Sequence, residues 1–387
     1  MPDYAALTHA LAQRRAEHLY RQRRVVESPQ GVEIKVEGRT LFNFCSNDYL
    51  GLASHPKLIQ AFTQAAQEYG VGSGAAHLIA GHSYHHHALE EELAAFVGRP
   101  RALLFSTGYM ANLGVVSALF GQGDAVFEDR LNHASLFDAG LLSRARLQRY
   151  AHNDVDALGE KLGASKANNK LIVTDGIFSM DGDMAVLDRL ASAAQQHDAW
   201  LMVDDAHGLG VAGETGRGSL EHYGLGLTEV PILMGTLGKA LGSFGAFIAG
   251  HEDLIETLIQ QARSYIYTTA LPPAVAAASR AALRLVDEEA WRREQLQGLL
   301  KQFRQGAEQL GLALMTSSSP IQPLLIGDSE RTVSISQALY EAGFLISAIR
   351  PPTVPRDTAR LRITFSANHT TEHVERLLQA LAKASRV

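Results

Sequence analysis

The stretch Pro231–Gly245, PILMGTLGKALGSFG, joins an apolar run to a lysine that is flanked by glycines and other small residues. The run Ile232–Met234 predicts a buried strand, and the glycines and other small residues around Lys239 let a planar group approach the backbone. Desolvation by the apolar strand favours the neutral, nucleophilic amine that a Schiff-base lysine needs. A loop lysine beside a glycine-rich turn is the alternative. A P-loop is excluded, because the four-residue gap and the following Ser or Thr are missing.

Short apolar runs alternate with helical segments on both sides of this stretch. The expected strands are residues 102–106, 125–128, 170–174, 201–203, 232–234 and 245–249, and the expected helices are about 109–120, 134–142, 154–163 and 185–197. Such alternation predicts an α/β fold with a mostly parallel sheet that is covered on both faces. In such a sheet, ligands bind beyond the carboxyl ends of the strands.

The rest of the chain predicts two further parts. Residues 1–50 read as an arm with an amphipathic helix over 3–24 and a hairpin, followed by a large domain over 51–285. Residues 286–387 read as a smaller C-terminal α+β domain, after a long helical region at about 273–310. Its expected strands are 322–326, 344–347 and 360–365, and its expected helices are 330–342 and 371–384.

Composition indicates an ordinary soluble enzyme-sized chain of 387 residues, 46% hydrophobic and 20% charged. A net charge of −6 argues against nucleic acid or an anionic membrane as the main partner. The longest apolar stretch, 102–120, is interrupted by polar residues and glycines, so no membrane span is expected. Cys45 is the only cysteine, which fits a reducing, cytoplasmic location.

Several residues with possible binding roles follow the ends of the expected strands and can therefore meet in one crevice. They are Gly108 with Tyr109, Ser179, Asp204 with His207, and Thr236 with Lys239. A buried Asp204 needs a cation or several donors, and a protonated pyridine nitrogen would be such a cation; a turn-capping aspartate is the alternative. Gly108 and Tyr109 open a helix, where free N–H groups favour a phosphate, although ordinary strand-to-helix packing has the same pattern.

Other motifs leave alternatives open or are rejected. Gly208-x-Gly210-x-x-Gly213 matches a dinucleotide fingerprint, but no helix follows it, so that interpretation is rejected. His133 fits either a helix cap or a side chain lying on a cofactor. Prolines hold Arg350 and Thr353 rigidly, so that Arg350 could pair with a carboxylate or form a surface salt bridge.

The histidine-rich segment that contains His82, His85, His86 and His87 also suggests a metal. We expect none, because adjacent histidines on one helix point in different directions, and His82 with His86 lacks a third ligand at a fixed spacing.

Five motifs together resemble the α-oxoamine synthase family of pyridoxal-phosphate enzymes. They are FNFCSNDYLGLASHP (42–56), GIFSMDGD (176–183), WLMVDDAHG (200–208), GTLGKALG (235–242) and IRPPTVPRDTARLR (349–362). They occur in the family's order over nearly the whole chain, and within the family they are most similar to the biotin-pathway member. The resemblance implies an aminotransferase-like fold of type I, with a large domain and a smaller C-terminal domain.

The resemblance implies specific roles around pyridoxal phosphate. Lys239 would bind the cofactor covalently and act as the base, Asp204 would pair with its ring nitrogen, and His133 would stack on its face. The remaining implied cofactor contacts are Ser179 and His207 near the phenolic oxygen, and Gly108, Tyr109 and Thr236 near the phosphate. Thr268 or Thr269 would reach a neighbouring subunit's phosphate, which implies a homodimer with shared active sites.

The implied reaction is the decarboxylative condensation of L-alanine with a pimeloyl thioester, carried by coenzyme A or by an acyl carrier protein. The substrate contacts carried over are Arg21 and Thr353 for the acyl substrate and Arg350 for the amino-acid carboxylate. Asn47, in a substrate-side motif, and His133 are further substrate contacts. Ala75 and Ala76 depart from the family's pattern near the acyl entrance. The alternatives are a sister enzyme that uses glycine with another acyl-CoA, a nucleotide-dependent oxidoreductase and a non-catalytic scaffold.

Overall fold

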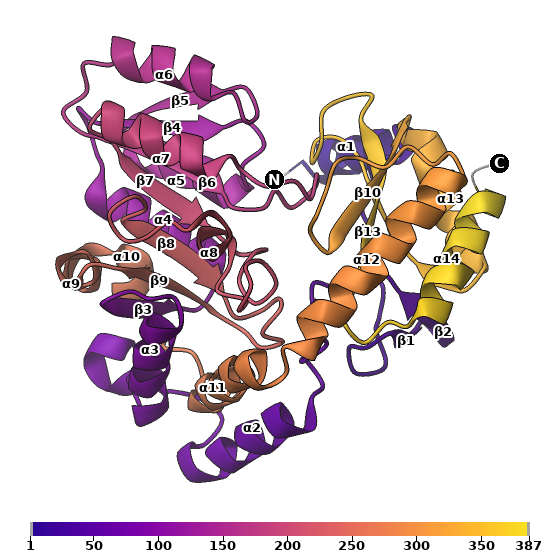
Figure 1. Ribbon diagram of the computed structural model, residues 1–387, viewed down its shortest axis with the longest axis horizontal. Helices are drawn as coiled ribbons and strands as arrows, with labels where there is room; N and C mark the ends of the chain where they lie inside the picture. Colours follow the sequence, from indigo (N-terminus) through magenta and orange to yellow (C-terminus); the bar gives the residue numbers. More distant parts are fainter. Residues whose placement is uncertain (1–2, 385–387) are drawn as a thin grey trace. The chain divides into compact units, whose positions relative to one another are not determined.

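The computed structural model describes residues 3–384, and contacts divide the chain into two compact units (Figure 1). The larger unit contains Leu50–Ser179 and Asp183–Arg293. The smaller unit contains the residues up to Tyr49, the short piece Met180–Gly182 and the residues from Glu294 onward. The N-terminal arm thus shares a unit with the C-terminal residues.

The larger unit is built on a seven-stranded sheet in the order β3-β9-β8-β7-β6-β4-β5. The strands are β3 (Arg101–Phe105), β4 (Ala125–Asp129), β5 (Arg146–Tyr150), β6 (Lys170–Asp175), β7 (Trp200–Asp204), β8 (Ile232–Thr236) and β9 (Ala246–Gly250). β9 runs antiparallel to its neighbours β3 and β8, and the other strands share one direction. The predicted mostly parallel α/β sheet is confirmed, and the carboxyl ends of these six strands meet at one edge.

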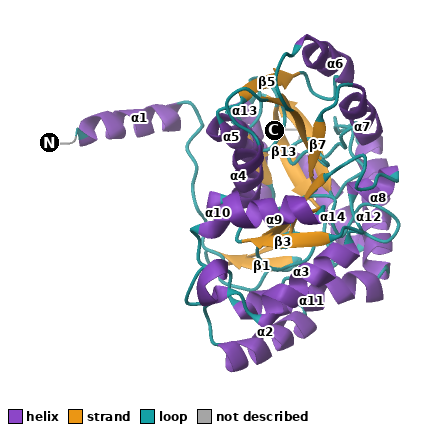
Figure 2. Ribbon diagram, turned by 90° about the vertical axis from the view of Figure 1, so that its left-hand side faces the viewer, coloured by secondary structure: helices purple, strands orange, loops and turns teal. Residues whose placement is uncertain are grey.

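Helices cover both faces of this sheet because successive strand residues point to opposite sides. On β6, Leu171 and Val173 pack with α4, α5 and α9, whereas Ile172 packs with α6 and α7. Figure 2 shows α4 and α5 on one side of the strands and α6 and α7 on the other. Burial of each such side chain stabilises the fold by about 1.5–3 kcal/mol.

The helices of this unit agree with the predicted ones where both exist. They are α2 (Pro56–Tyr69), α3 (Tyr84–Phe96), α4 (Gly108–Leu119), α5 (Ala134–Ser143), α6 (Val155–Ala164), α7 (Leu187–Gln196), α8 (Ser219–Tyr223), α9 (Glu252–Gln261), α10 (Arg263–Ile266) and α11 (Pro273–Glu288), with a π-helical turn η1 (His77–Gly81). The predicted helical region 273–310 forms two helices, α11 and α12 (Trp291–Gln309), which are separated at residues 289–290.

The smaller unit holds two three-stranded sheets, β1-β2-β11 and β10-β13-β12. Its elements are α1 (Tyr4–Ala16), β1 (Glu33–Val36), β2 (Arg39–Asn43), β10 (Ile321–Gly327), α13 (Ser329–Glu341), β11 (Phe344–Leu345), β12 (Ser347–Ile349), β13 (Ala359–Thr364) and α14 (Thr371–Ala384). The predicted hairpin is confirmed as β1 and β2. The predicted strand 344–347 is divided between β11 and β12, which belong to different sheets.

The N-terminal helix is shorter than predicted. It ends at Ala16, so that the basic cluster from Arg21 onward lies outside it, and none of its residues is buried. Among the described residues, no helix has the length and apolar character needed to span a bilayer.

Candidate active site

One cavity of about 160 Å³ opens at the carboxyl edge of the large sheet. It is lined by Gly108, Tyr109, His133, Ser135, Asp175, Asp204, Ala206, His207, Met234, Thr236 and Lys239. The ends of β6, β7 and β8 contribute Asp175, Asp204 and Thr236, and α4 begins beside them. The parallel topology therefore gathers residues from five separate segments of the sequence.

A tight loop after β8 positions Lys239. The N–H of Leu237 donates to the carbonyl of Gly245, and the N–H of Gly242 donates to the carbonyl of Lys239, both at 2.9 Å. Gly242 has a φ of 62°, and a Cβ there would lie 2.4 Å from the Ala53 nitrogen, so only glycine fits. Lys239 Nζ consequently lies inside the cavity, 2.7 Å from His207 Nε2.

Asp204 is 5% exposed and has donors on both carboxylate oxygens. Its Oδ2 accepts from Asn112 Nδ2 at 2.8 Å, and its Oδ1 accepts from the Ala206 N–H at 3.1 Å. The next residue, Asp205, faces elsewhere, because its carboxylate accepts from the N–H and hydroxyl of Ser219 at 2.7 and 2.6 Å. Of the two adjacent aspartates, Asp204 therefore lines the cavity, whereas Asp205 binds Ser219 at the start of α8.

His133 caps the start of α5 and lines the cavity. Its Nδ1 lies 2.7 Å from the Ser135 hydroxyl, and its backbone N–H donates to Asp175 Oδ1 at 3.2 Å. Burial lowers the pKa of His133, so the neutral imidazole is favoured. Burial, followed by the neighbouring charge of Asp204, raises the pKa of Asp175 well above its usual range. The site thus holds two carboxyl groups in different environments.

The start of α4 forms another wall of the cavity. Thr107 caps the helix by accepting from the Met110 N–H, and the first N–H groups of a helix have no partner within the helix itself. A Cβ on Gly108 would lie 3.2 Å from Met234 Cε, so glycine keeps this wall open. The Tyr109 hydroxyl donates to Asp138. This wall has the donors that an anionic group requires.

The structure gathers part of the predicted site in the larger unit. Gly108, Tyr109, His133, Asp204, His207, Thr236 and Lys239 line the cavity. Ser179 is buried in the same unit and is not among the lining residues.

Of the predicted substrate residues, His133 lies in the larger unit, whereas Arg21, Asn47, Arg350 and Thr353 lie in the smaller unit. Arg21 Nη2 donates to Thr353 Oγ1 at 3.0 Å, so these two are in contact. Asn47 Oδ1 accepts from Arg362 Nη2 at 3.2 Å, and Arg350 donates to the carbonyl of His18.

Three polar residues of the site were not predicted as site residues: Asn112, Ser135 and Asp175. Asn112 is fully buried, and its Nδ2 bridges Ser135 Oγ and Asp204 Oδ2, at 2.8 Å each. A signal was present for Asn112, because it is a polar residue in an otherwise apolar helix one turn after Gly108. Asp175 could have been found by the strand-end rule that identified Asp204.

Comparison with known proteins identifies the family. The family model of class I and II aminotransferases matches residues 39–381. The chain is 64% identical to the 8-amino-7-oxononanoate synthase of Nitrosococcus oceani, over 96% of this chain and 99% of the relative. It is 62% identical to the enzyme of the same name from Saccharophagus degradans, over 98% of this chain and 96% of the relative.

A solved structure shares the fold. Serine palmitoyltransferase from S. paucimobilis, solved with a bound PLP–myriocin aldimine, matches with a TM-score of 0.94 at 30% identity. The match covers 99% of this chain and 97% of the other.

Proposed function

Because this chain belongs to the class I and II aminotransferase family and, within it, to the 8-amino-7-oxononanoate synthases, we propose that it joins L-alanine to a pimeloyl thioester. The reaction forms a carbon–carbon bond between the alanine Cα and the thioester carbonyl carbon. It releases carbon dioxide and the free thiol carrier and gives 8-amino-7-oxononanoate for biotin synthesis. The chain is thus a pyridoxal-phosphate-dependent acyltransferase. The observation that carries this proposal is the Lys239 amine, which lies in one cavity with the buried carboxylate of Asp204.

The residues of this cavity fit pyridoxal phosphate. A buried carboxylate is costly unless it meets a cation, and a protonated pyridine nitrogen supplies one to Asp204. The N-terminus of α4, kept open by Gly108, suits the phosphate, and we propose Tyr109 and Thr236 as further phosphate-side contacts. When bound, the cofactor supplies an aldehyde and a ring that accepts the electron pair left on Cα.

We propose that Lys239 is both the covalent anchor and the proton carrier. Its amine can remove a proton from the substrate Cα and return one after carbon dioxide leaves. His207, 2.7 Å from the amine, holds it within the cavity by a hydrogen bond. Asn112 keeps the Asp204 carboxylate oriented. His133, neutral because burial lowers its pKa, can lie against the ring without repelling a positively charged group.

The substrate-side roles are also proposals. We assign the acyl chain to Arg21 and Thr353, which contact each other, with Asn47 as a further substrate contact. Arg350 would pair with the amino-acid carboxylate, since guanidinium groups bind carboxylates in bidentate fashion. Ser179 would act with His207 near the phenolic oxygen of the cofactor. We propose a cytoplasmic location, since a chain with one cysteine has no need of an oxidising compartment.

We propose that the chain works as a homodimer with shared sites. Several large apolar side chains are exposed on the larger unit, namely Val71, Ile79 and Tyr267, at 86%, 81% and 71%. Exposed apolar groups that form a contiguous patch mark interaction surfaces, and burial of these three side chains against a second copy would remove them from water. Thr269 forms a β-bridge with Ala76 next to them. Size-exclusion chromatography with light scattering should give twice the mass of the chain, and a monomer would contradict this part of the proposal.

The substrate assignment is tested by incubating the purified holoenzyme with L-alanine or glycine and a panel of acyl thioesters. We expect 8-amino-7-oxononanoate by mass spectrometry from alanine with pimeloyl-CoA or pimeloyl carrier protein, and the faster of the two thioesters identifies the carrier. Faster turnover of glycine with a shorter or longer acyl-CoA would support a sister enzyme instead.

A further inference from the structure

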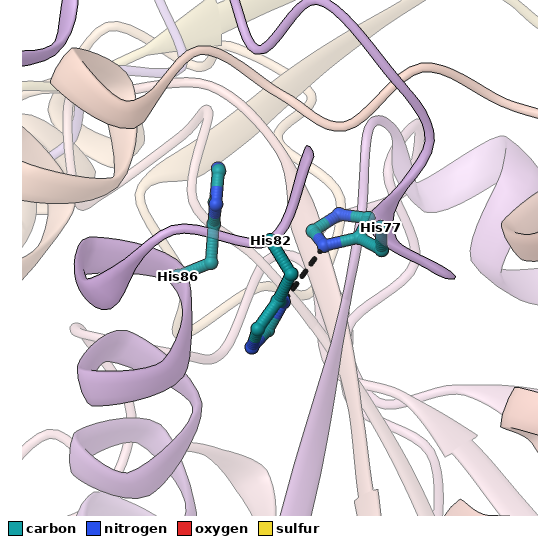
Figure 3. A group of neighbouring side chains, drawn as sticks. All are labelled: His77, His82 and His86. Carbon is teal, nitrogen blue, oxygen red and sulfur yellow. Dashed lines mark hydrogen bonds between the residues drawn. The ribbon is translucent and has the colours of Figure 1, made fainter. Parts of the chain in front are cut away.

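A histidine cluster lies in the larger unit, between the start of η1 and the first turn of α3. His77, His82 and His86 approach one another there, and Figure 3 shows the contact between His77 and His82. A second cavity of about 430 Å³ is lined by His77, His82, His87 and Glu90, among other residues. The cluster therefore borders a space that solvent and small ions can enter.

His86 is not available as a ligand. Its Nδ1 accepts from the Ser83 N–H at 2.9 Å, and its Nε2 lies 2.6 Å from the Leu271 carbonyl. Because a carbonyl can only accept, Nε2 carries the proton, and both ring nitrogens are occupied. This buried histidine ties the start of α3 to the segment after α10.

His82, His87 and Glu90 form a second group whose ligand atoms can converge. One potential ligand atom from each residue lies within 4.8 Å of the other two, and His82 Nε2 is 4.0 Å from Glu90 Oε2. His87 and Glu90 are three residues apart on α3 and share a face of the helix. Zinc ligands at 2.0–2.1 Å in a tetrahedron lie about 3.4 Å apart. Small side-chain rotations therefore suffice to close the group around an ion.

Neighbouring contacts already orient two of these ligands. His77 Nδ1 lies 2.9 Å from His82 Nδ1, and the His77 ring stacks on Tyr265 with centroids 5.1 Å apart. When His82 Nδ1 donates in this contact, its Nε2 lone pair faces Glu90. Glu90 Oε1 accepts from the Leu104 N–H at 2.9 Å, which leaves Oε2 for another partner. Such outer contacts fix the tautomer and direction of metal ligands.

The partial burial of these side chains also favours a cation at the same place. The side chain of Glu90 is 14% exposed and that of His82 is 30% exposed. A buried carboxylate is costly unless a cation compensates it.

We propose that His82, His87 and Glu90 bind a zinc ion, with a fourth position open to the 430 Å³ cavity. Two imidazoles and one carboxylate are a known zinc ligand set. The sequence predicted no metal here, because His82 and His86 lacked a third partner at a fixed spacing; in the folded chain His87 and Glu90 take the place of His86. The site is independent of the pyridoxal-phosphate cavity, with which it shares no lining residue.

The test is calorimetric titration of EDTA-treated and dialysed holoenzyme with zinc chloride. We expect one zinc per chain in the wild type and at least tenfold weaker binding in His87→Ala and in Glu90→Gln. His87 is two-thirds exposed, so its replacement leaves the fold intact, and glutamine keeps the acceptor for Leu104. His85→Ala is the matched control on the same helix, and its zinc affinity should equal that of the wild type.

Two results would overturn the assignment. One is the absence of stoichiometric zinc binding by the wild type, and the other is wild-type affinity in His87→Ala. A further variant, His77→Phe, keeps a ring against Tyr265 but removes the contact to His82. We expect it to bind zinc about 10–100-fold more weakly.

Discussion

Asn112 on α4 donates a hydrogen bond from Nδ2 to Oδ2 of Asp204 at 2.8 Å, and both side chains are buried. The same amide nitrogen lies 2.8 Å from the Ser135 hydroxyl. Asn112 thus links α4, the helix proposed to bind the phosphate, to the carboxylate at the end of β7. No motif names this residue, yet it controls the direction of the acid proposed to face the cofactor ring.

We predict that Asn112→Ala weakens pyridoxal-phosphate binding about tenfold and lowers the free energy of unfolding by about 1–3 kcal/mol, since a buried carboxylate loses a donor. Fluorescence titration of the apoenzyme with cofactor measures the first effect, and urea unfolding measures the second. Ser117→Ala on the same helix is the control. If Asn112→Ala lost stability but bound the cofactor with wild-type affinity, the asparagine would have only a structural role.

The central sheet could be predicted because its strands are short, apolar and regularly spaced between helices. That topology also explains why the sequence alone predicts Asp204 and Thr236 with Lys239 at one edge of the sheet. β5 was missed because its sequence, RLQRY, is polar, and this edge strand is only partly buried. Its pairing with β4, and not its composition, makes it a strand.

The hydrogen-bond partners of individual side chains could not be predicted from the sequence pattern as the strands were. Asp204 and Asp205 both end the strand pattern, and only the folded chain shows that Ser219 engages Asp205. Arg21 and Thr353 are separated by more than three hundred residues, and their contact depends on how the smaller unit folds. Spacing rules act over a few turns of one element, whereas these pairs are set by packing between elements.

Gly208 should be intolerant of any side chain. A Cβ there would lie 2.1 Å from Asp205 Oδ1 and 2.5 Å from Ser219 Oγ, so Gly208→Ala must break the hydrogen bonds that compensate a buried carboxylate. We expect a loss of about 3 kcal/mol or more in urea unfolding. Gly159→Ala is the contrasting variant, since a Cβ in the middle of α6 would meet nothing within 4 Å. It should stabilise the protein by about 0.5–1 kcal/mol, and equal effects of the two substitutions would contradict this explanation.

His152 should make stability depend on pH in the alkaline range. Burial opposes its charge, but hydrogen bonds to Asp129 at 3.1 Å and Asp183 at 2.7 Å raise the pKa of His152 to about 10. The folded pKa is therefore above the unfolded value of about 6.5. The stabilisation is fully present below pH 6.5 and is lost as the pH rises toward 10, by up to about 1.4 kcal/mol per pH unit.

The measurement is urea unfolding of the wild type and of His152→Gln between pH 6 and pH 10. Glutamine keeps a donor but cannot be charged, so the difference between the two proteins should shrink steadily with rising pH. A difference that stays constant over this range would mean that His152 is neutral in the folded protein.

Lys239→Ala should abolish turnover even if the cofactor remains bound without a covalent link. Loss of a general base alone costs about 10²–10⁴-fold in rate, and here the covalent anchor is lost as well. Borohydride reduction followed by peptide mass spectrometry should locate the cofactor on Lys239 in the wild type and on no lysine in the variant. Lys166→Ala, at an exposed position after α6, should retain activity and the modified Lys239 peptide. Appreciable turnover by Lys239→Ala would show that another group acts as the base. Borohydride labelling of a different lysine in the wild type would show that another amine binds the cofactor. Either result would mean that the 2.7 Å contact between Lys239 and His207 has no catalytic role.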